Sequence, residues 1–181
     1  MSVAGFADRP ARDGYDVVIV GGGIMGASTA WFLTQEPDFD GSVLVIERDP
    51  SYAFASTTHT NSCMRQQFST ELNVRISQFA ADFVKTIRER MGGDERVPQL
   101  SIRSFGYMYL AADRDFADVL RANQRVQRAA GAATQLMTPD EIAAAYPFYT
   151  VDDVVLGSIN LVDEGYWDGA TVFDWWRRQS R

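Results

Sequence analysis

The chain has 181 residues, of which 17 are Lys or Arg and 24 are Asp or Glu, so its formal net charge is −7. With 46% hydrophobic and 12% aromatic residues it can bury a core, which excludes a disordered tail and a collagen-like fibre. The acidic balance argues against nucleic acid as the main partner. One His and one Cys cannot supply a zinc site of the usual ligands, so we expect no metal.

The most apolar stretch, residues 17–33, does not read as a membrane span. Glycines and a Ser-Thr pair interrupt it, and aspartates precede it where a secretory signal would carry cations. We therefore expect no membrane-spanning segment. The single cysteine, Cys63, excludes an internal disulfide and fits a reducing compartment, so a cytoplasmic location is expected.

The first elements form a βαβ unit. After a loose leader over 1–14, the β-branched run 15–20 predicts a buried parallel strand. Small and apolar residues at helical spacing predict a helix over 24–34, which Pro37 stops, and 43–46 predicts a second strand. Strand, helix and strand within about thirty residues are typical of this unit.

The middle of the chain alternates a polar loop with a long helix. Residues 51–69 have no period and many hydroxyls, which is typical of a functional loop. Apolar residues at helical spacing predict one helix over 70–91, terminated by Gly92 and Gly93.

The remaining residues have a different, β-rich character. Strand-like runs at 101–110 and 151–161 enclose an amphipathic helix over 113–130, and Thr138-Pro139-Asp140-Glu141 predicts a capping box that opens another helix. A last helix is expected over 168–178. Only two strands of the parallel type are predicted, and a stable parallel sheet buried on both faces needs more. We therefore expect the chain to be the front part of a longer protein.

A glycine-rich turn carries the clearest chemical signal. Gly21, Gly23 and Gly26 fit G-x-G-x-x-G between the first predicted strand and helix, and Glu47 ends the second strand. The glycines allow a tight turn, close approach of the backbone to a pyrophosphate and close packing of helix on strand. Glu47 can accept hydrogen bonds from ribose hydroxyls; its alternative role is to cap a strand end in solvent. The turn therefore predicts dinucleotide binding.

An ordered series of motifs resembles one flavoprotein family. The glycine turn with Ala30, Leu33, Val45 and Glu47, the Ser-Thr-Thr-His loop at 56–59 and Arg-Gln-Gln-Phe at 65–68 are similar to the D-amino acid oxidase-like FAD-dependent oxidoreductases. That family includes glycine and sarcosine oxidases and dimethylglycine dehydrogenase, and 65–68 resembles its FOXRED-like branch. Residues 105–110 resemble its first substrate-domain strand, and 163–168 resemble its turn back into the FAD domain.

The resemblance implies an α/β fold: a Rossmann-like FAD-binding βαβ unit with part of a β-rich substrate domain. It implies an FAD-binding domain over 15–97, a partial substrate-binding domain over 98–165 and a return helix over 166–181. It also implies a set of cofactor-binding residues, which are Gly21, Gly23, Ile24, Met25, Gly26, Glu47, Arg48, Ser56, Thr57, His59, Thr60, Asn61 and Ser62.

Two residues are candidates for a catalytic role. By the resemblance, His59 can carry a covalent flavin, because a neutral imidazole is a nucleophile near pH 7; alternatively it only hydrogen-bonds the cofactor or lies on the surface. Arg65 can pair with a substrate carboxylate or stabilise negative charge on reduced flavin. The alternative for Arg65 is a surface ion pair with Glu71.

Other polar residues have plainer interpretations. We expect turn and cap roles for Asp163, Glu164 and Asp168. Cys63 is interpreted as a core thiol.

The resemblance implies oxidation of the C–N bond of a small amine or amino acid, of the glycine, sarcosine or D-amino acid type. Hydride passes to FAD and leaves an imine that hydrolyses. The family's second half is not in this chain, so we expect this part alone to be inactive and to need the C-terminal half of the same protein. The alternatives are a catalytically incomplete FAD-binding fragment or assembly factor, and an NAD-dependent dehydrogenase.

Overall fold

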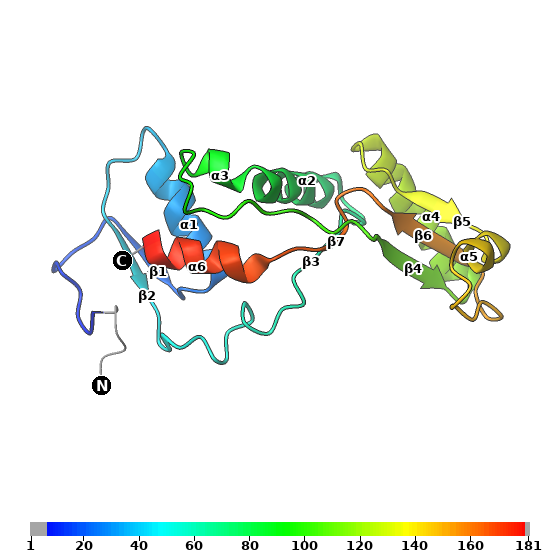
Figure 1. Ribbon diagram of the computed structural model, residues 1–181, viewed down its shortest axis with the longest axis horizontal. Helices are drawn as coiled ribbons and strands as arrows, with labels where there is room; N and C mark the ends of the chain where they lie inside the picture. Colours follow the sequence, from blue (N-terminus) through cyan, green and yellow to red (C-terminus); the bar gives the residue numbers. More distant parts are fainter. Residues whose placement is uncertain (1–6, 180–181) are drawn as a thin grey trace. The chain divides into compact units, whose positions relative to one another are not determined.

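The computed structural model describes residues 7–179, so residues 1–6 of the predicted leader and the end of the predicted return helix lie outside the described part. The described residues form two units (Figure 1). Unit 1 combines the residues up to Asn61 with those from Asp168 onward, and unit 2 spans Ser62–Trp167.

Unit 1 contains the βαβ motif that the sequence predicts. Strands β1 (Val17–Val20) and β2 (Val43–Ile46) pair in parallel, and helix α1 (Ile24–Gln35) connects them. Strand β1 begins two residues later than expected, because the Asp16 carboxylate accepts hydrogen bonds from the Ser42 amide and hydroxyl. The same bonds hold the pKa of Asp16 below its usual value.

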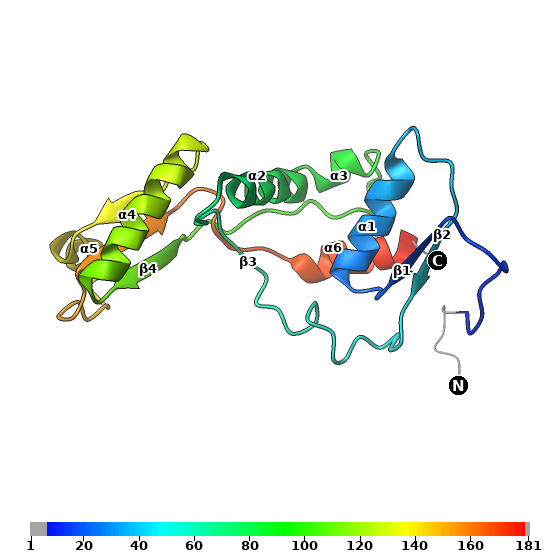
Figure 2. The same cartoon turned by 180° about the vertical axis from the view of Figure 1, so that it is seen from behind.

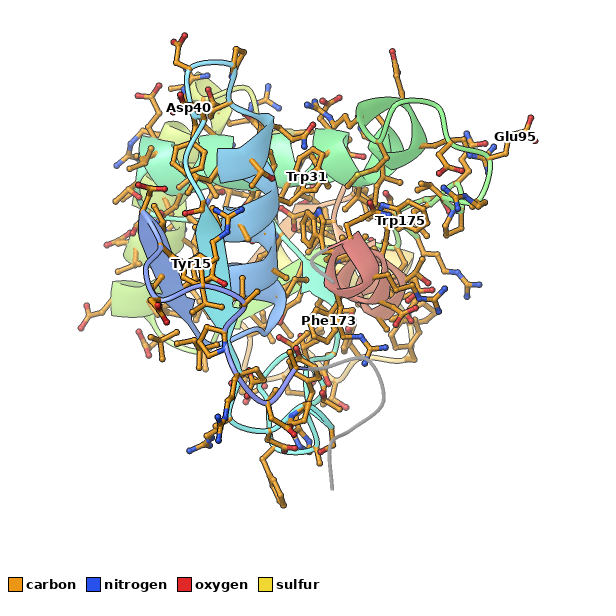
Figure 3. The ribbon with its side chains drawn as sticks, turned by 90° about the vertical axis from the view of Figure 1, so that its left-hand side faces the viewer. Tyr15, Trp31, Asp40, Glu95, Phe173 and Trp175 are labelled. Carbon is orange, nitrogen blue, oxygen red and sulfur yellow. The ribbon has the colours of Figure 1, made fainter. Side chains whose placement is uncertain are left out.

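The last helix, α6 (Gly169–Gln179), packs against α1 in unit 1, as Figure 2 shows from behind. Trp31 of α1 lies between the two helices (Figure 3), with its ring centroid 6.3 Å from that of the buried Trp176. The opposite face of the short sheet is uncovered, and Val20 is 85% exposed there. Parallel sheets are normally covered on both faces.

Unit 2 begins with a pair of very short strands. Strand β3 (Cys63–Met64) is antiparallel to β7 (Gly165–Tyr166), although the paired residues are 101 and 103 positions apart in the sequence. Gly165 has φ +145°, and a Cβ there would lie 2.1 Å from the Arg103 carbonyl oxygen. Only glycine fits this crossing of two chain segments.

The predicted helix over 70–91 is two helices, α2 (Glu71–Lys85) and α3 (Ile87–Arg90). The single-helix prediction is wrong at Thr86, which has φ −109° and ψ 14°. Its hydroxyl donates to the Asp82 carbonyl, a local bond that competes with continuation of the helix. Gly92 and Gly93 both have positive φ and end this segment as predicted.

A three-stranded antiparallel sheet completes unit 2. Strands β4 (Tyr107–Ala111), β6 (Leu156–Asn160) and β5 (Gln135–Met137) lie in the order β4-β6-β5. The sequence predicts no strand at β5, because three residues are too few to show an alternating pattern.

Two capped helices accompany this sheet. Helix α4 (Arg114–Ala129) starts at Asp113, whose side chain accepts from the Phe116 amide. It packs on the sheet in a small core of Ala111, Ala117, Leu120 and Leu156. Helix α5 (Pro139–Ala145) begins with both hydrogen bonds of the predicted capping box in place.

The division into units places α2 and α3 with the β-rich part of the chain. The family's domain limits, with an FAD-binding domain over 15–97, a substrate-binding domain over 98–165 and a return helix over 166–181, stay a prediction. No described helix is long and apolar enough to cross a membrane.

Candidate functional site

The glycine turn in unit 1 is closed tightly around its own backbone. The Gly21 amide donates to the Ile46 carbonyl at 2.7 Å, and Gly21 has φ +104°, so β1 ends here. A Cβ on Gly26 would lie 1.8 Å from the Gly21 carbonyl oxygen. Backbone atoms cannot yield to that contact, so helix and strand meet only because position 26 has no side chain.

Glu47 faces this turn. One carboxylate oxygen accepts from the Gly22 amide at 2.8 Å, and the other accepts from the Asp49 amide at 2.9 Å. Glu47 thus contacts the glycine turn as well as the chain just after β2, and its bond to a ribose stays a prediction. An ionised carboxylate has about four acceptor positions, so two remain for hydroxyl groups of a ligand.

The start of α1 is capped from the polar loop. Gly23 has no side chain to cap the helix, and the Thr57 hydroxyl accepts from the Ile24 amide at 3.0 Å. An oxygen atom thus already lies where a helix N-terminus attracts phosphate oxygens. A Cβ on Gly23 would lie 3.1 Å from the same hydroxyl, so the turn and loop fit closely.

The rest of the polar loop folds on itself. Tyr52 is buried with φ +57°, and the Thr58 hydroxyl donates to its carbonyl. The His59 ring is exposed, and its Nε2 contacts the Ala53 carbonyl oxygen at 2.8 Å. A carbonyl oxygen only accepts, so this contact places a proton on Nε2 and leaves the lone pair of a neutral ring on Nδ1. The other predicted cofactor residues of unit 1 with exposed side chains are Met25, Arg48, Ser56, Thr60 and Asn61.

Arg65 lies in unit 2, where the chain leaves β3. Its guanidinium carbon is 5.1 Å from the centroid of the Phe68 ring and 5.6 Å from that of Tyr107. Its Nε is buried and has no hydrogen-bond partner among the described residues. The alternative ion pair with Glu71 is wrong, because Glu71 pairs with Arg75 at 2.7 Å.

The most buried carboxylate of unit 2 is Glu164, with a relative exposure of 0%. Its Oε1 accepts from the Gln66 amide at 2.6 Å and from Asn160 Nδ2 at 2.9 Å. Its Oε2 accepts from Gln67 Nε2 at 2.9 Å. Desolvation raises the pKa of Glu164, and the hydrogen bonds and the Arg65 charge oppose that rise.

The expectation of a turn or cap role for Glu164 is wrong. Its sequence neighbours do have such roles: Asp168 accepts from the Thr171 amide at the start of α6, and Asp163 has φ +54° in the turn before β7. Nothing in the local pattern separates the three acids, since the hydrogen-bond donors to Glu164 include residues almost 100 positions away.

Two tyrosines of β4 extend the surroundings of Arg65. The rings of Tyr107 and Tyr109 are 5.5 Å apart. Burial raises the pKa of Tyr109, and the nearby Arg65 charge opposes the rise. Arg65 is therefore a cation among aromatic rings.

Cys63, interpreted from the sequence as a core thiol, is exposed, which corrects that interpretation.

Comparison with known proteins agrees with this geometry. Residues 16–180 match the family described as FAD dependent oxidoreductase. The chain belongs to this family. Its cofactor is FAD, and the backbone turn and acceptor set around Gly22, Ile24 and Glu47 fit a dinucleotide. The family match contradicts the alternative of an NAD-dependent dehydrogenase. The described residues contain no group of three His, Cys, Asp or Glu side chains placed to hold a metal ion.

Several curated proteins are similar to this FAD-dependent chain. It is 38% identical to FAD-dependent oxidoreductase domain-containing protein 1 of Xenopus laevis over 169 residues, and 37% identical to the Bos taurus protein over 167 residues. Both alignments cover 91% of this chain. It is 25% identical to human mitochondrial sarcosine dehydrogenase. The chain spans 34% of the Xenopus protein and 17% of the human one.

Solved structures show the same fold. L-proline dehydrogenase from P. horikoshii matches with a TM-score of 0.71 and 27% identity, over 91% of this chain and 41% of that one. Glycine oxidase from Geobacillus kaustophilus matches with a TM-score of 0.67 and 18% identity, over 92% and 44%. The fold is thus a Rossmann-like βαβ unit with part of a β-rich domain, as the resemblance implies.

Proposed function

We propose that this chain is part of an FAD-dependent oxidoreductase that oxidises the C–N bond of a small amine or amino acid, of the glycine, sarcosine or D-amino acid type. Relatives and structural neighbours named for sarcosine, glycine and L-proline support this class. Each of those compounds has an amine nitrogen on the carbon next to a carboxylate. Bound FAD supplies the acceptor for a hydride from that carbon.

The residues around the glycine turn would hold the cofactor. The Gly23 and Met25 amides would meet the pyrophosphate, because a helix N-terminus attracts phosphate oxygens. The Ile24 amide would join them once a phosphate oxygen replaces the Thr57 hydroxyl that it now contacts. Glu47 would accept from the ribose hydroxyls, and Arg48 would lie near the adenine. The polar residues proposed to line the remainder of the cofactor are Ser56, Thr57, His59, Thr60, Asn61 and Ser62.

The single observation that carries the substrate class is the buried Nε of Arg65, which has no hydrogen-bond partner among the described residues. A cation whose Nε is buried without a partner gains most from a bidentate anionic ligand. The flanking Phe68 and Tyr107 rings hold the guanidinium plane and exclude water from one side. We assign Arg65 the substrate carboxylate, which places it among the residues that touch the substrate.

An anaerobic reduction experiment tests this function. The FAD-loaded product of the whole gene is mixed with glycine, sarcosine, L-proline and several D-amino acids, and bleaching of the flavin absorbance is followed in time. We expect bleaching by at least one of these compounds and none by the matching amines that lack a carboxylate. An Arg65→Gln variant that is reduced as fast as the wild type at low substrate concentration would remove Arg65 from the site.

Covalent attachment through His59 is a separate proposal with a separate test. The contact with the Ala53 carbonyl uses Nε2, so Nδ1 is the nitrogen left for reaction, and the side chain is exposed. Acid precipitation of the holoprotein separates free from attached flavin. Flavin retained in the pellet of the wild type and absent from that of His59→Ala would establish the linkage, and flavin released from both would exclude it.

A second candidate function is FAD binding without catalysis, as in an assembly factor. The relatives with the highest printed identities leave this function open, because their name, FAD-dependent oxidoreductase domain-containing protein 1, gives no substrate. The reduction experiment separates the two, because such a protein binds FAD and is not bleached by any amine.

A cytoplasmic location, which the single cysteine supports, is tested by fractionation of the source cells.

A further inference from the structure

We propose that Glu164 is a positioning residue. It holds the peptide segment 65–67 and so keeps the Arg65 guanidinium against the Phe68 and Tyr107 rings. The three direct hydrogen bonds to its carboxylate come from two regions of the sequence: Gln66 and Gln67 on one side, and Asn160 on the other. The importance of this positioning for substrate binding rests on the function proposed above.

The bonds fix both the backbone and the side chains next to Arg65. Gln66 directly follows Arg65, and its backbone amide donates to the Glu164 carboxylate at 2.6 Å. The Gln66 side chain donates in addition to the Val162 carbonyl. A segment that is bonded through main chain and side chain has little freedom to turn its neighbouring arginine.

The hydrogen-bonded group of Glu164, Gln66, Gln67 and Asn160 is called the clamp below. Gln67 connects this clamp to β4, the strand that carries the Tyr107 ring. Its Nε2 donates to Glu164 Oε2 and also to the Tyr107 carbonyl at 2.6 Å. Its Oε1 accepts from the Ser158 hydroxyl at 2.9 Å, which fixes which way the amide faces. One side chain therefore connects the buried carboxylate, the Arg65 segment and strand β4.

The clamp needs a carboxylate at this position. Gln67, Ser158, Asn160 and Glu164 are all buried, so each donor that loses its acceptor stays unsatisfied. In a Glu164→Gln variant the amide oxygen still accepts from Gln66 and Asn160, but its NH2 group faces the NH2 group of Gln67. Gln67 cannot reverse its amide without losing the bonds to Ser158 and Tyr107.

Chemical labelling of arginines measures the position of Arg65 without any assay of activity. The FAD-loaded protein is treated with limiting phenylglyoxal, and peptide mass spectrometry gives the labelling rate of Arg65 relative to that of Arg88. Arg88 is a half-buried arginine of α3 in the same unit, and its Nε donates to the Val97 carbonyl. We expect Glu164→Gln to raise this ratio about tenfold, which corresponds to the loss of one charge-assisted hydrogen bond. General loosening of unit 2 would raise both rates and leave the ratio unchanged.

Glu71→Gln is the matched control, because it removes an exposed carboxylate of the same unit that pairs with Arg75. We expect it to leave the Arg65 ratio at the wild-type value. Ser158→Ala is the second variant for the case that Glu164→Gln does not fold, since it removes the bond that orients the Gln67 amide and leaves the carboxylate in place. An unchanged Arg65 ratio in whichever of these two variants folds would overturn the positioning role.

Binding of acetate separates this inference from the proposed function. Acetate is titrated into the FAD-loaded protein, and the flavin absorbance change gives its Kd. We expect Glu164→Gln to weaken acetate binding about tenfold in the wild-type background and to have no further effect in Arg65→Gln. If Arg65→Gln itself leaves the Kd unchanged, Arg65 is not the carboxylate anchor; the labelling ratio still decides whether Glu164 positions it.

Discussion

The two regions of this molecule that bear on function are built in opposite ways. The glycine turn of unit 1 is made of backbone: amides point at acceptors, and a Cβ at position 26 would collide with the Gly21 carbonyl. The Glu164 cluster of unit 2 consists of the buried side chains of Gln67, Ser158, Asn160 and Glu164, which pair their hydrogen-bond donors and acceptors with one another. A backbone site fails when an atom is added, whereas a side-chain network fails when a charge or donor is changed.

The largest expected effect comes from adding one methyl group to the turn. Gly26→Ala places a Cβ 1.8 Å from a backbone oxygen, so helix and strand must separate. Such overpacking typically costs about 1–3 kcal/mol or more, and here it also distorts the FAD cradle. We expect no flavin in the purified protein by absorbance. Gly14→Ala is the control, since nothing lies within 4 Å of its added Cβ; flavin retained in both variants would contradict the backbone cradle.

A smaller effect is expected from Glu47→Gln. The change keeps the shape of the side chain and leaves the Gly22 or the Asp49 amide facing an NH2 group. Loss of a charged acceptor costs about 1.5–3 kcal/mol, so FAD affinity should fall by about tenfold or more. Quenching of flavin fluorescence on binding measures the Kd. The exposed Glu36→Gln variant should bind as the wild type does; equal affinity in all three proteins would show that Glu47 is not part of the site.

The side-chain cluster predicts a pH dependence of stability. The pKa of Glu164 is raised in the folded protein, so above the unfolded value of about 4.5 the folded state holds its proton longer than the unfolded state does. The contribution of this group to the unfolding free energy therefore falls as pH rises from about 4.5 through the raised pKa. Urea unfolding at a series of pH values should show this decline in the wild type and a flatter profile in Glu164→Gln. Parallel profiles would mean that Glu164 has the same pKa in both states.

The smallest effect is expected at an ordinary helix cap and sets the scale for the others. Thr138 accepts from the Glu141 amide in the capping box of α5. Thr138→Ala should lower the free energy of unfolding by about 1 kcal/mol and leave FAD binding unchanged. Thr138→Ser keeps the hydroxyl and should behave as the wild type in the same urea titration. A loss of flavin in Thr138→Ala would contradict this prediction.

Local signals in the sequence were enough for much of the fold. The βαβ unit follows from two β-branched runs on either side of a helical pattern, and the capping box follows from four adjacent residues. The glycine turn is equally local, because its spacing alone brings Gly21 and Gly26 together. The missed break at Thr86 and the missed strand β5 are short features whose signal is weaker than that of the elements around them.

What the tertiary structure decided is which acid and which arginine matter in unit 2. Asp163, Glu164 and Asp168 look alike in sequence, and Arg65 is followed by the acidic residue Glu71 a short way along the chain. Only folding brings Gln66 and Gln67 to Glu164 from almost 100 positions away. The Glu71–Arg75 pair, in contrast, is local, because the two residues lie one turn apart in α2. The physical reason is burial: a side chain's electrostatic role depends on the solvent it loses and the partners it gains, and both come from distant parts of the chain.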